Sequence, residues 1–186
     1  MTKKEFAAKI LPPEQLPPKI AAARQKGQKI VLTQGSFDLV HIGHGRYLAE
    51  AKRHGDVLFV GVDSDAKVRQ RKGPERPVVP EEERLEMLSY LEPVDYVILK
   101  SATDPKWSLI KAIRPDVLIA TKKTYTSAQL KELEKLCGQV ISLEEQATTS
   151  TSAKIRRVQI GAATKITQTL SKKLIRTIEE VLDELN

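Results

Sequence analysis

The sequence has little of several features that would narrow its class. Its single cysteine, Cys137, excludes an internal disulfide framework, and no group of cysteines and histidines has the spacing of a structural zinc site. Aromatic residues make up only 4% of the chain, so a core must rest on leucine, isoleucine and valine. No apolar run near the N-terminus is long enough for a signal peptide or a membrane span, so we expect a cytoplasmic protein without a membrane partner.

What is present suits a globular protein with one compact domain and appended helices: 186 residues, 40% of them apolar and 30% charged. Lysine and arginine outnumber aspartate and glutamate by 31 to 24, a net charge of +7. Such an excess favours either a nucleic-acid surface or a pocket for anionic small molecules such as nucleoside triphosphates. Because the basic residues are spread along the chain, concentrating only at 67–76 and 154–157, we do not expect general nucleic-acid binding.

Short apolar runs alternate with helical patterns along most of the chain. This alternation predicts an α/β fold, a doubly wound parallel sheet of about five strands with an extra C-terminal helix. We expect strands at 30–32, 57–62, 94–99, 117–120 and 140–143. We expect helices at 45–54, from Pro80, at 107–113, at 127–137 and from about Ser152.

The two ends of the chain differ from this pattern. Residues 1–28 are predicted to be a lead-in of linker and short helix (20–26), because Pro12-Pro13 and Pro17-Pro18 break a long helix. Residues 29–160 would form the main domain. In 161–186, apolar residues recur every three or four positions, which predicts an amphipathic helix. We expect it to pack back on the domain; contact in a homodimer is the alternative.

Ligands of such sheets bind beyond the carboxyl ends of the strands. That rule points to two predicted loops, 34–45 and 63–80. In the first loop, Gly35 lets the backbone come close to a ligand, and His41 and His44 share a face of the first helical turn. The helix N-terminus adds N–H groups and a positive dipole end. The sequence therefore predicts a polyphosphate site where two imidazoles donate hydrogen bonds to developing charge.

The series Gly-x-Phe-Asp-x-x-His-x-Gly-His, from Gly35 to His44, resembles the signature of the cytidylyltransferase-like nucleotidyltransferases, a superfamily with a Rossmann-like fold. Over about residues 28–158 the chain is similar to the adenylyltransferase domain of the ADP-heptose synthase family. The resemblance implies transfer of AMP from ATP to D-glycero-D-manno-heptose 1-phosphate, with release of pyrophosphate. The sugar-kinase domain often fused ahead of this module is absent, so we expect a stand-alone transferase.

The resemblance also implies catalytic roles. His41 and His44 would contact the triphosphate and stabilise the transferring α-phosphoryl group. Lys72 would neutralise charge on the incoming phosphate or leaving pyrophosphate, with Arg69 and Arg71 as alternatives for that place. The attacking phosphate oxygen is already ionised, so no general base is needed. Mg²⁺ would be bound through the triphosphate and not by protein side chains.

Nucleotide contacts are implied at a longer set of positions. These are Gly35, Ser36, Phe37, Asp38, Gly43, Asp63, Arg84, Ser150, Thr151 and Ser152. The three hydroxyls at 150–152 suit a phosphate at a helix start, but a plain helix cap has the same pattern. Asp63 and Asp65 would contact ribose or Mg²⁺, with a solvated turn as the alternative for each. Asp38 is expected to orient the loop, and Arg84 has a surface ion pair with Glu81 or Glu82 as its alternative.

One segment departs from the heptose branch. That branch carries a Lys-Gly-Gly-Asp-Tyr-like stretch after the fourth strand, whereas residues 120–125 read Ala-Thr-Lys-Lys-Thr-Tyr. Lys122 and Lys123, together with Arg69 and Arg71, still suit a phosphorylated acceptor, but its identity stays open. A CTP-dependent enzyme acting on glycerol 3-phosphate or another alcohol phosphate is one alternative, and a non-catalytic nucleotide- or RNA-binding module is another.

Overall fold

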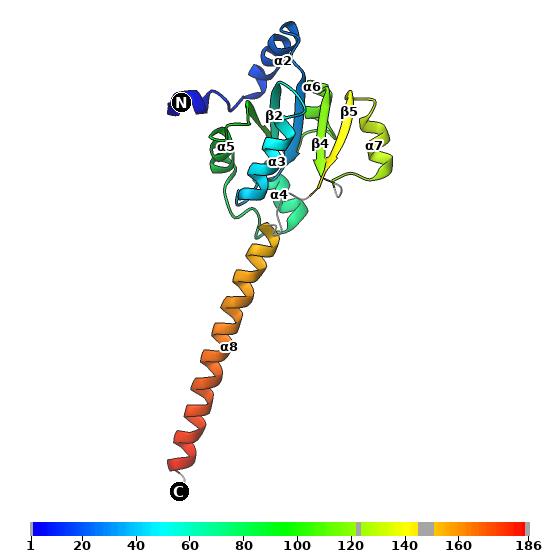
Figure 1. The fold of residues 1–186 in the computed structure, drawn as a ribbon. Helices are drawn as coiled ribbons and strands as arrows, with labels where there is room; N and C mark the ends of the chain where they lie inside the picture. Colours follow the sequence, from blue (N-terminus) through cyan, green and yellow to red (C-terminus); the bar gives the residue numbers. More distant parts are fainter. Residues whose placement is uncertain (1, 122–123, 145–150, 185–186) are drawn as a thin grey trace. The chain divides into compact units, whose positions relative to one another are not determined.

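The computed structural model describes residues 2–121, 124–144 and 151–184. The chain divides into two compact units, 1–148 and 149–186. The first unit holds the sheet and its helices, and the second is a single long helix (Figure 1).

The first unit is built on a parallel sheet whose strand order is β3-β2-β1-β4-β5. Both neighbours of β1 run parallel to it, and Val31 lies opposite Leu58 on one side and Val117 on the other. The predicted doubly wound parallel sheet is therefore confirmed. Its described strands are β1 Ile30–Gly35, β2 Val57–Asp63, β3 Tyr96–Lys100, β4 Val117–Thr121 and β5 Gln139–Leu143.

Helices follow the strands in the expected alternation. The described helices are α1 Lys3–Ala7, η1 Pro13–Gln15, α2 Leu16–Gln25, α3 Ile42–Lys52, α4 Asp65–Lys72, α5 Glu81–Ser89, α6 Ser108–Ile113, α7 Ser127–Leu133 and α8 Thr151–Glu184. The first of the two predicted loops is shorter than expected, because α3 begins at Ile42 behind a His41 cap and not at Gly45. The prediction of a loop at 63–80 was wrong, because this segment contains α4. The side chain of Ser64 caps α4 by accepting a hydrogen bond from the Lys67 N–H.

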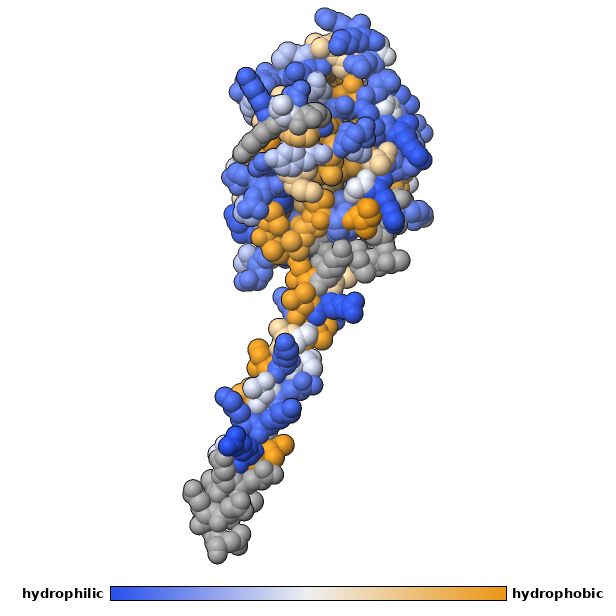
Figure 2. All heavy atoms as spheres, turned by 60° about the vertical axis from the view of Figure 1, so that its left-hand side comes forward, coloured by the Kyte–Doolittle hydropathy of each residue, from blue (hydrophilic) through white to orange (hydrophobic). Residues whose placement is uncertain are grey.

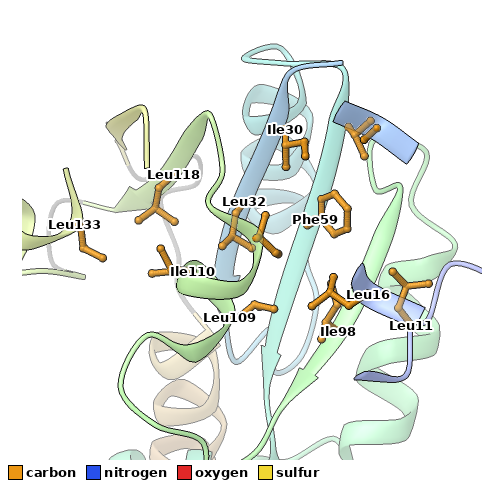
Figure 3. Close-up of a cluster of buried hydrophobic side chains, with 13 residues drawn as sticks. Leu11, Leu16, Ile30, Leu32, Phe59, Ile98, Leu109, Ile110, Leu118 and Leu133 are labelled. Carbon is orange, nitrogen blue, oxygen red and sulfur yellow. The ribbon is translucent and has the colours of Figure 1, made fainter. Parts of the chain in front are cut away.

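Two hydrophobic clusters cover the two faces of the sheet. One contains Phe59, Leu118 and Leu133 with side chains of α2 and α6 (Figure 3). The other contains Val60 with side chains of α3 and α5. Burial of the strands on both faces explains why they read as continuous apolar runs.

The N-terminal segment belongs to this core. Leu11 and Leu16 are buried in the first cluster, and Ile10 bridges Val97 beside the edge strand β3. The expected helix 20–26 was placed too late, because α2 begins at Leu16. Pro17 and Pro18 lie in its first turn, where a missing N–H breaks no intrahelical bond.

The second unit is α8, which begins at Thr151, one residue before the helical start expected at about Ser152, and continues through the predicted amphipathic helix of 161–186. Apolar side chains recur along it (Figure 2), and Val158, Ile166, Leu170, Leu174 and Ile178 are 50–72% exposed. The expected packing of this helix on the domain stays a prediction. In the described part of the chain, no helix combines the length and the apolarity needed to cross a membrane.

Candidate functional site

The loop between β1 and α3 is shaped by Phe37. Its side chain is only 5% exposed and packs in the cluster that includes Leu48 and Val60. Phe37 and Leu39 both have a positive φ, 48° and 51°, so the chain turns sharply on either side of Asp38. A Cβ on Gly35 would lie 3.1 Å from the Phe37 ring, so the missing side chain makes room for that ring. Close approach of a ligand at Gly35 stays a prediction.

His41 and His44 form a capping box at the N-terminus of α3. The Gly43 N–H donates to Nδ1 of His41 at 3.1 Å, and the His41 N–H donates to Nδ1 of His44 at 3.3 Å. The two ring centroids are 4.2 Å apart. The predicted pairing of the imidazoles at the first helical turn is therefore confirmed, with the backbone at Gly43 as part of it.

These contacts settle which nitrogen carries the proton in the neutral rings. Because Nδ1 of each ring accepts a backbone N–H, the hydrogen of each neutral imidazole sits on Nε2. His41 and His44 then both present an Nε2–H donor without carrying a formal charge. The α3 N-terminus adds its own positive dipole end, so this turn suits a polyanion.

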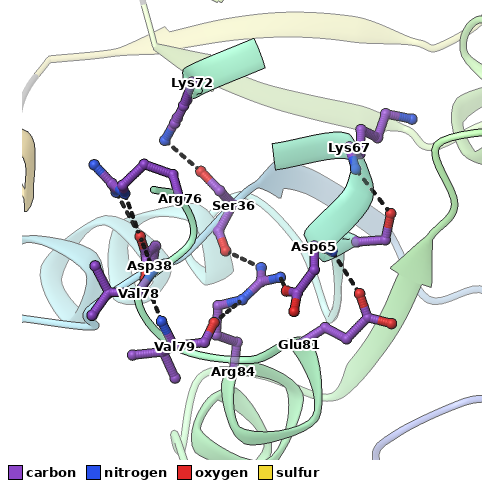
Figure 4. A network of polar contacts seen from close by, with 11 residues as sticks. Ser36, Asp38, Asp65, Lys67, Lys72, Arg76, Val78, Val79, Glu81 and Arg84 are labelled. Carbon is purple, nitrogen blue, oxygen red and sulfur yellow. Dashed lines mark hydrogen bonds and ion pairs between the residues drawn. The ribbon is translucent and has the colours of Figure 1, made fainter. Parts of the chain in front are cut away.

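Asp38 clamps the loop to the segment before α5. Its carboxylate accepts from Nε of Arg76 at 2.7 Å and from the N–H groups of Val78 at 3.1 Å and Val79 at 3.0 Å (Figure 4). Burial alone would raise the pKa of Asp38, but the two backbone donors and Arg76 outweigh burial and lower it. Asp38 is thus an ionised structural group, as expected of a residue that orients the loop.

Arg84 is completely buried and bridges three segments. Its Nη1 donates to the main-chain oxygen of Ser36, Nε donates to the oxygen of Val79 at 2.9 Å, and Nη2 pairs with Asp65 at 2.7 Å (Figure 4). The alternative of a surface ion pair with Glu81 or Glu82 was wrong, because the guanidinium points inward from α5. The solvated turn at Asp65 was also wrong, because Asp65 begins α4 and its carboxylate pairs with the buried Arg84. A direct nucleotide contact of Arg84 stays a prediction; in this structure it holds the loop that carries Ser36.

Lys72 ends α4 beside the same loop. Its Nζ donates to Oγ of Ser36 at 2.6 Å, which places a cation against the β1–α3 loop (Figure 4). Burial of the ammonium, followed by the charges of Arg76 and Arg71, lowers the pKa of Lys72. Three basic residues were candidates for neutralising phosphate charge. Of these, Lys72 is the one that forms a hydrogen bond with the β1–α3 loop.

The other two basic candidates have different surroundings. Arg71 pairs with Asp63 at 2.6 Å, while Arg69 is exposed on α4. Asp63 also pairs with Lys100 at 3.0 Å, and its side chain is 1% exposed. The solvated turn that was the alternative for Asp63 was therefore wrong. Its contact with ribose or Mg²⁺ stays a prediction.

Several of the predicted positions fall outside what the structure describes. Lys122, Lys123 and Ser150 are outside the described residues, and Thr151 and Ser152 are described only as the start of α8. Within the described residues, no group of three or more His, Cys, Asp or Glu side chains is arranged to hold a metal ion.

Sequence reasoning did not single out Arg76, Lys100 or Tyr125. Arg76 could have been noticed as a basic residue next to Pro77 in a segment that already carried the resemblance. Tyr125 is the last residue of the altered segment 120–125, and its hydroxyl accepts from Nε2 of Gln34 at 3.4 Å. Burial, followed by the charges of Tyr47 and Asp63, raises its pKa to about 12, so it is a neutral phenol at the end of β1.

Together these groups make a turn that can bind and stabilise negative charge. Two neutral Nε2–H donors, a helix N-terminus and the Lys72 cation meet at the carboxyl end of β1. Strand order reverses between β1 and β4, the place where open α/β sheets bind ligands. The geometry favours electrostatic stabilisation of a phosphoryl group over acid–base or nucleophilic catalysis.

Comparison with known proteins agrees with this chemistry. A sequence model of the cytidylyltransferase-like family matches residues 32–178. The chain is 40% identical, over 152 residues, to the bifunctional protein HldE of Shigella sonnei (strain Ss046), a match that covers 81% of this chain and 32% of that protein. It is 42% identical over 115 residues to HldE of Syntrophotalea carbinolica, covering 62% of this chain and 23% of the relative. The chain thus spans about a third or less of these curated relatives.

Solved structures support the same fold. The lipopolysaccharide core biosynthesis protein from Thermoplasma volcanium GSS1 is 30% identical, with a TM-score of 0.53; the match covers 67% of this chain and 100% of that one. Pantoate-beta-alanine ligase from Francisella tularensis is 17% identical, with a TM-score of 0.51, over 73% of this chain and 66% of that one. At that identity the ligase supports the fold alone.

Proposed function

Because the chain is a nucleotidyltransferase that belongs to the cytidylyltransferase-like family, we propose that it transfers AMP from ATP to a heptose 1-phosphate or a related sugar 1-phosphate. Pyrophosphate is the second product. The observation that carries this proposal is the His41–His44 capping box, in which both Nδ1 atoms accept from the backbone and both Nε2 atoms keep their hydrogens. The 40% identity to HldE over 81% of the chain favours the sugar phosphate as acceptor.

In the proposed reaction, an ionised oxygen of the acceptor phosphate attacks the α-phosphorus of the triphosphate. A new P–O bond forms, the bond to the bridging oxygen of the β-phosphate breaks, and pyrophosphate leaves with that electron pair. The Nε2–H groups of His41 and His44 stabilise the charge on the transferring group, and Lys72 neutralises charge beside Ser36. The triphosphate brings its Mg²⁺ as part of the substrate.

The loop that carries Ser36 is held in place before the nucleotide arrives. Asp38 fixes one side of it to Val78 and Val79, and Arg84 fixes its main chain at Ser36. Binding energy is then available for alignment of the phosphates and is not consumed in ordering the loop.

A second candidate is CTP-dependent transfer to glycerol 3-phosphate or another alcohol phosphate. The observation that favours it is the acceptor loop, where residues 120–125 lack both glycines and the acid of the heptose branch. The site chemistry at Ser36, His41 and His44 is the same for both candidates.

A matrix of substrates tests the proposal. Pyrophosphate release would be measured with ATP, CTP, GTP and UTP, each crossed against heptose 1-phosphate, other sugar 1-phosphates and glycerol 3-phosphate. We expect the highest rate with ATP and a sugar 1-phosphate. CTP with an alcohol phosphate as the best pair would favour the second candidate. Release with no pair, together with nucleic-acid binding that weakens steeply with salt, would favour a non-catalytic module.

A further inference from the structure

Lys100 is the last residue of β3, and its side chain passes over Gly61 toward the carboxyl end of β2. A Cβ on Gly61 would lie 2.8 Å from Cδ of Lys100 and 2.7 Å from Cδ2 of Leu109, so the missing side chain leaves room for the lysine. Its Nζ donates to the carboxylate of Asp63 at 3.0 Å. Because only 15% of the Lys100 side chain is exposed, this cation is held within the protein.

The ammonium of Lys100 has more hydrogens than protein partners. A lysine ammonium carries three donor hydrogens. Among the described residues, the carboxylate of Asp63 is the one hydrogen-bond partner of Nζ. Buried polar groups are normally paired, so the remaining donors of this largely buried cation suit a ligand.

Positive charge exceeds negative charge around Lys100. The carboxylate of Asp63 is shared with Arg71, whose Nη1 lies 2.6 Å from its other oxygen. Lys67 donates to the main-chain oxygen of Ser101 at 3.1 Å, which places a third cation beside the end of β3. Burial lowers the pKa of Lys100, and the Asp63 carboxylate opposes this effect. The charges of Lys67 and Arg71 lower the pKa further, and a bound anion would offset their repulsion.

Two neutral side chains extend this group of donors across the sheet. Cγ of Gln34 would lie 3.1 Å from the same Cβ on Gly61, so Gln34 and Lys100 both lie against this glycine. Nε2 of Gln34 donates to the hydroxyl of Tyr125 at 3.4 Å. That hydroxyl keeps its own hydrogen, because its pKa is raised to about 12. An ammonium, an amide and a phenol are thus gathered at the carboxyl end of the sheet, a combination of donors that suits a phosphate.

These donors and the His41–His44 turn belong to opposite faces of the sheet. Alternate residues of a strand point to opposite faces, so Lys100 shares the face of Ile98, which packs with Leu109 of α6 (Figure 3). Helix α3, which begins at the histidine turn, packs on the other face. In phosphoryl transfer the attacking and leaving oxygens lie roughly in line, on opposite sides of the phosphorus. The face of Lys100 therefore suits the attacking phosphate, and the histidine turn suits the triphosphate.

We propose that Lys100 binds the phosphate of the acceptor and holds it for attack on the α-phosphorus. This inference rests on the proposed function, because it takes the acceptor to be a phosphate ester. Asp63 is a positioning residue in this arrangement, since it fixes the ammonium at the end of β2. The contribution of Lys100 is then expected in the affinity for the acceptor and not in the rate of the bound complex.

Steady-state pyrophosphate release separates acceptor binding from the other steps. Lys100→Met keeps an unbranched chain against Gly61 and leaves Asp63 paired with Arg71. We expect KM for the acceptor to rise by about tenfold or more, while kcat and KM for the triphosphate stay within about threefold of wild type. Lys111→Met removes an exposed cation from α6 and should change none of these values. An unchanged acceptor KM, or an equal loss in kcat and both KM values, would overturn the proposal.

A variant that keeps the charge separates anion binding from packing. Lys100→Arg retains a cation beside Asp63, although its geometry differs from that of an ammonium. Its acceptor KM is expected to lie between those of wild type and Lys100→Met. If Lys100→Arg raised the acceptor KM more than Lys100→Met does, the side chain would act through packing, and the assignment of Lys100 to the acceptor phosphate would be wrong.

Binding of inorganic phosphate gives a readout that does not depend on turnover. The full chain is first saturated with α,β-methylene-ATP, so that the triphosphate contacts are occupied, and phosphate is then added in a calorimeter. We expect Lys100→Met to bind phosphate at least about tenfold more weakly than wild type and to bind the ATP analogue equally well. This loss in a chain that releases no pyrophosphate with any substrate pair would contradict the proposed function but support the phosphate site. Equal phosphate affinity in the two proteins, or none in wild type, would overturn the site itself.

Discussion

The buried guanidinium of Arg84 donates a hydrogen bond to the main-chain oxygen of Ser36, 48 residues earlier in the chain. The same guanidinium pairs with Asp65 at the start of α4. One side chain thus connects the β1–α3 loop, α4 and α5, so the position of Ser36 depends on a residue that is itself out of reach of solvent.

Replacement of Arg84 by methionine should therefore affect stability and nucleotide binding together. The carboxylate of Asp65 and the oxygens of Ser36 and Val79 would lose their partner, and we expect the free energy of unfolding to fall by about 3 kcal/mol. Urea denaturation measures this fall. Arg69→Met removes an exposed guanidinium from α4 and should change the free energy of unfolding by less than about 0.5 kcal/mol. Equal effects of the two changes would refute the bridging role.

Loss of either imidazole should slow the reaction without unfolding the chain. His41→Ala and His44→Ala are each expected to lower kcat by at least about a hundredfold, as for loss of a donor to the transition state. Steady-state pyrophosphate release measures the effect. His54→Ala, at the other end of α3, is the matched control and should leave kcat close to wild type. Near-normal turnover in both active-site variants would contradict the assignment.

A substitution at His41 can separate helix capping from donation to phosphate. His41→Asn keeps a side-chain oxygen that can accept from the Gly43 N–H, as asparagine does at many helix starts. We expect this variant to regain most of any stability lost in His41→Ala, because the cap is restored, while its kcat remains low. Thermal unfolding and turnover, measured on the same samples, distinguish the two roles. Recovery of turnover along with stability would show that His41 acts only as a cap.

The lowered pKa of Asp38 predicts how its contribution to stability changes with pH. A depressed folded-state pKa stabilises the protein above the unfolded value of about 3.9, and this stabilisation is lost as the pH falls through the folded pKa. Asp38→Asn should therefore lower the free energy of unfolding by about 2 kcal/mol at pH 7. The gap between the two proteins should narrow below about pH 4. Denaturant titrations across this range provide the measurement, and a gap that stays constant with pH would argue against an ionised clamp.

Lys72 should give kcat/KM an alkaline limit below the ordinary lysine value of 10.5, because its pKa is lowered in the folded protein. As the pH rises through that lowered pKa, the ammonium loses its proton and the charge beside Ser36 disappears, so kcat/KM should fall. In Lys72→Arg, the guanidinium stays charged and the fall should vanish, although the rate at neutral pH is lower. A pH profile of both proteins tests this; an unchanged alkaline limb in Lys72→Arg would assign the titration to another group.

The sheet and the His41–His44 turn could be predicted because their signals are local. Buried parallel strands are continuous apolar runs, and the histidine pair lies three residues apart after a strand. Helix α4 was missed because of its eight residues only Val68 is buried, so no apolar period marks it. Ser64, its cap, was the one local signal of its start.

The inner support of the site could not be predicted, because its partners are far apart in sequence. Asp38 meets Arg76 across 38 residues, and Lys72 meets Ser36 across 36. Nothing near Arg84 distinguishes a buried guanidinium from an exposed one in a helix with three glutamates in its first turn. Such contacts follow from how α4 and α5 pack on the sheet, which the local pattern does not contain.

The packing of Phe37 limits how this protein can exchange its ligands. The ring is part of the same buried cluster as Leu48 and Val60, so the β1–α3 loop cannot swing outward without exposing core side chains to water. Substrate entry and product departure must then rely on segments other than this loop. The β1–α3 loop stays in place during turnover, and the movements that admit substrate and release product occur in other segments.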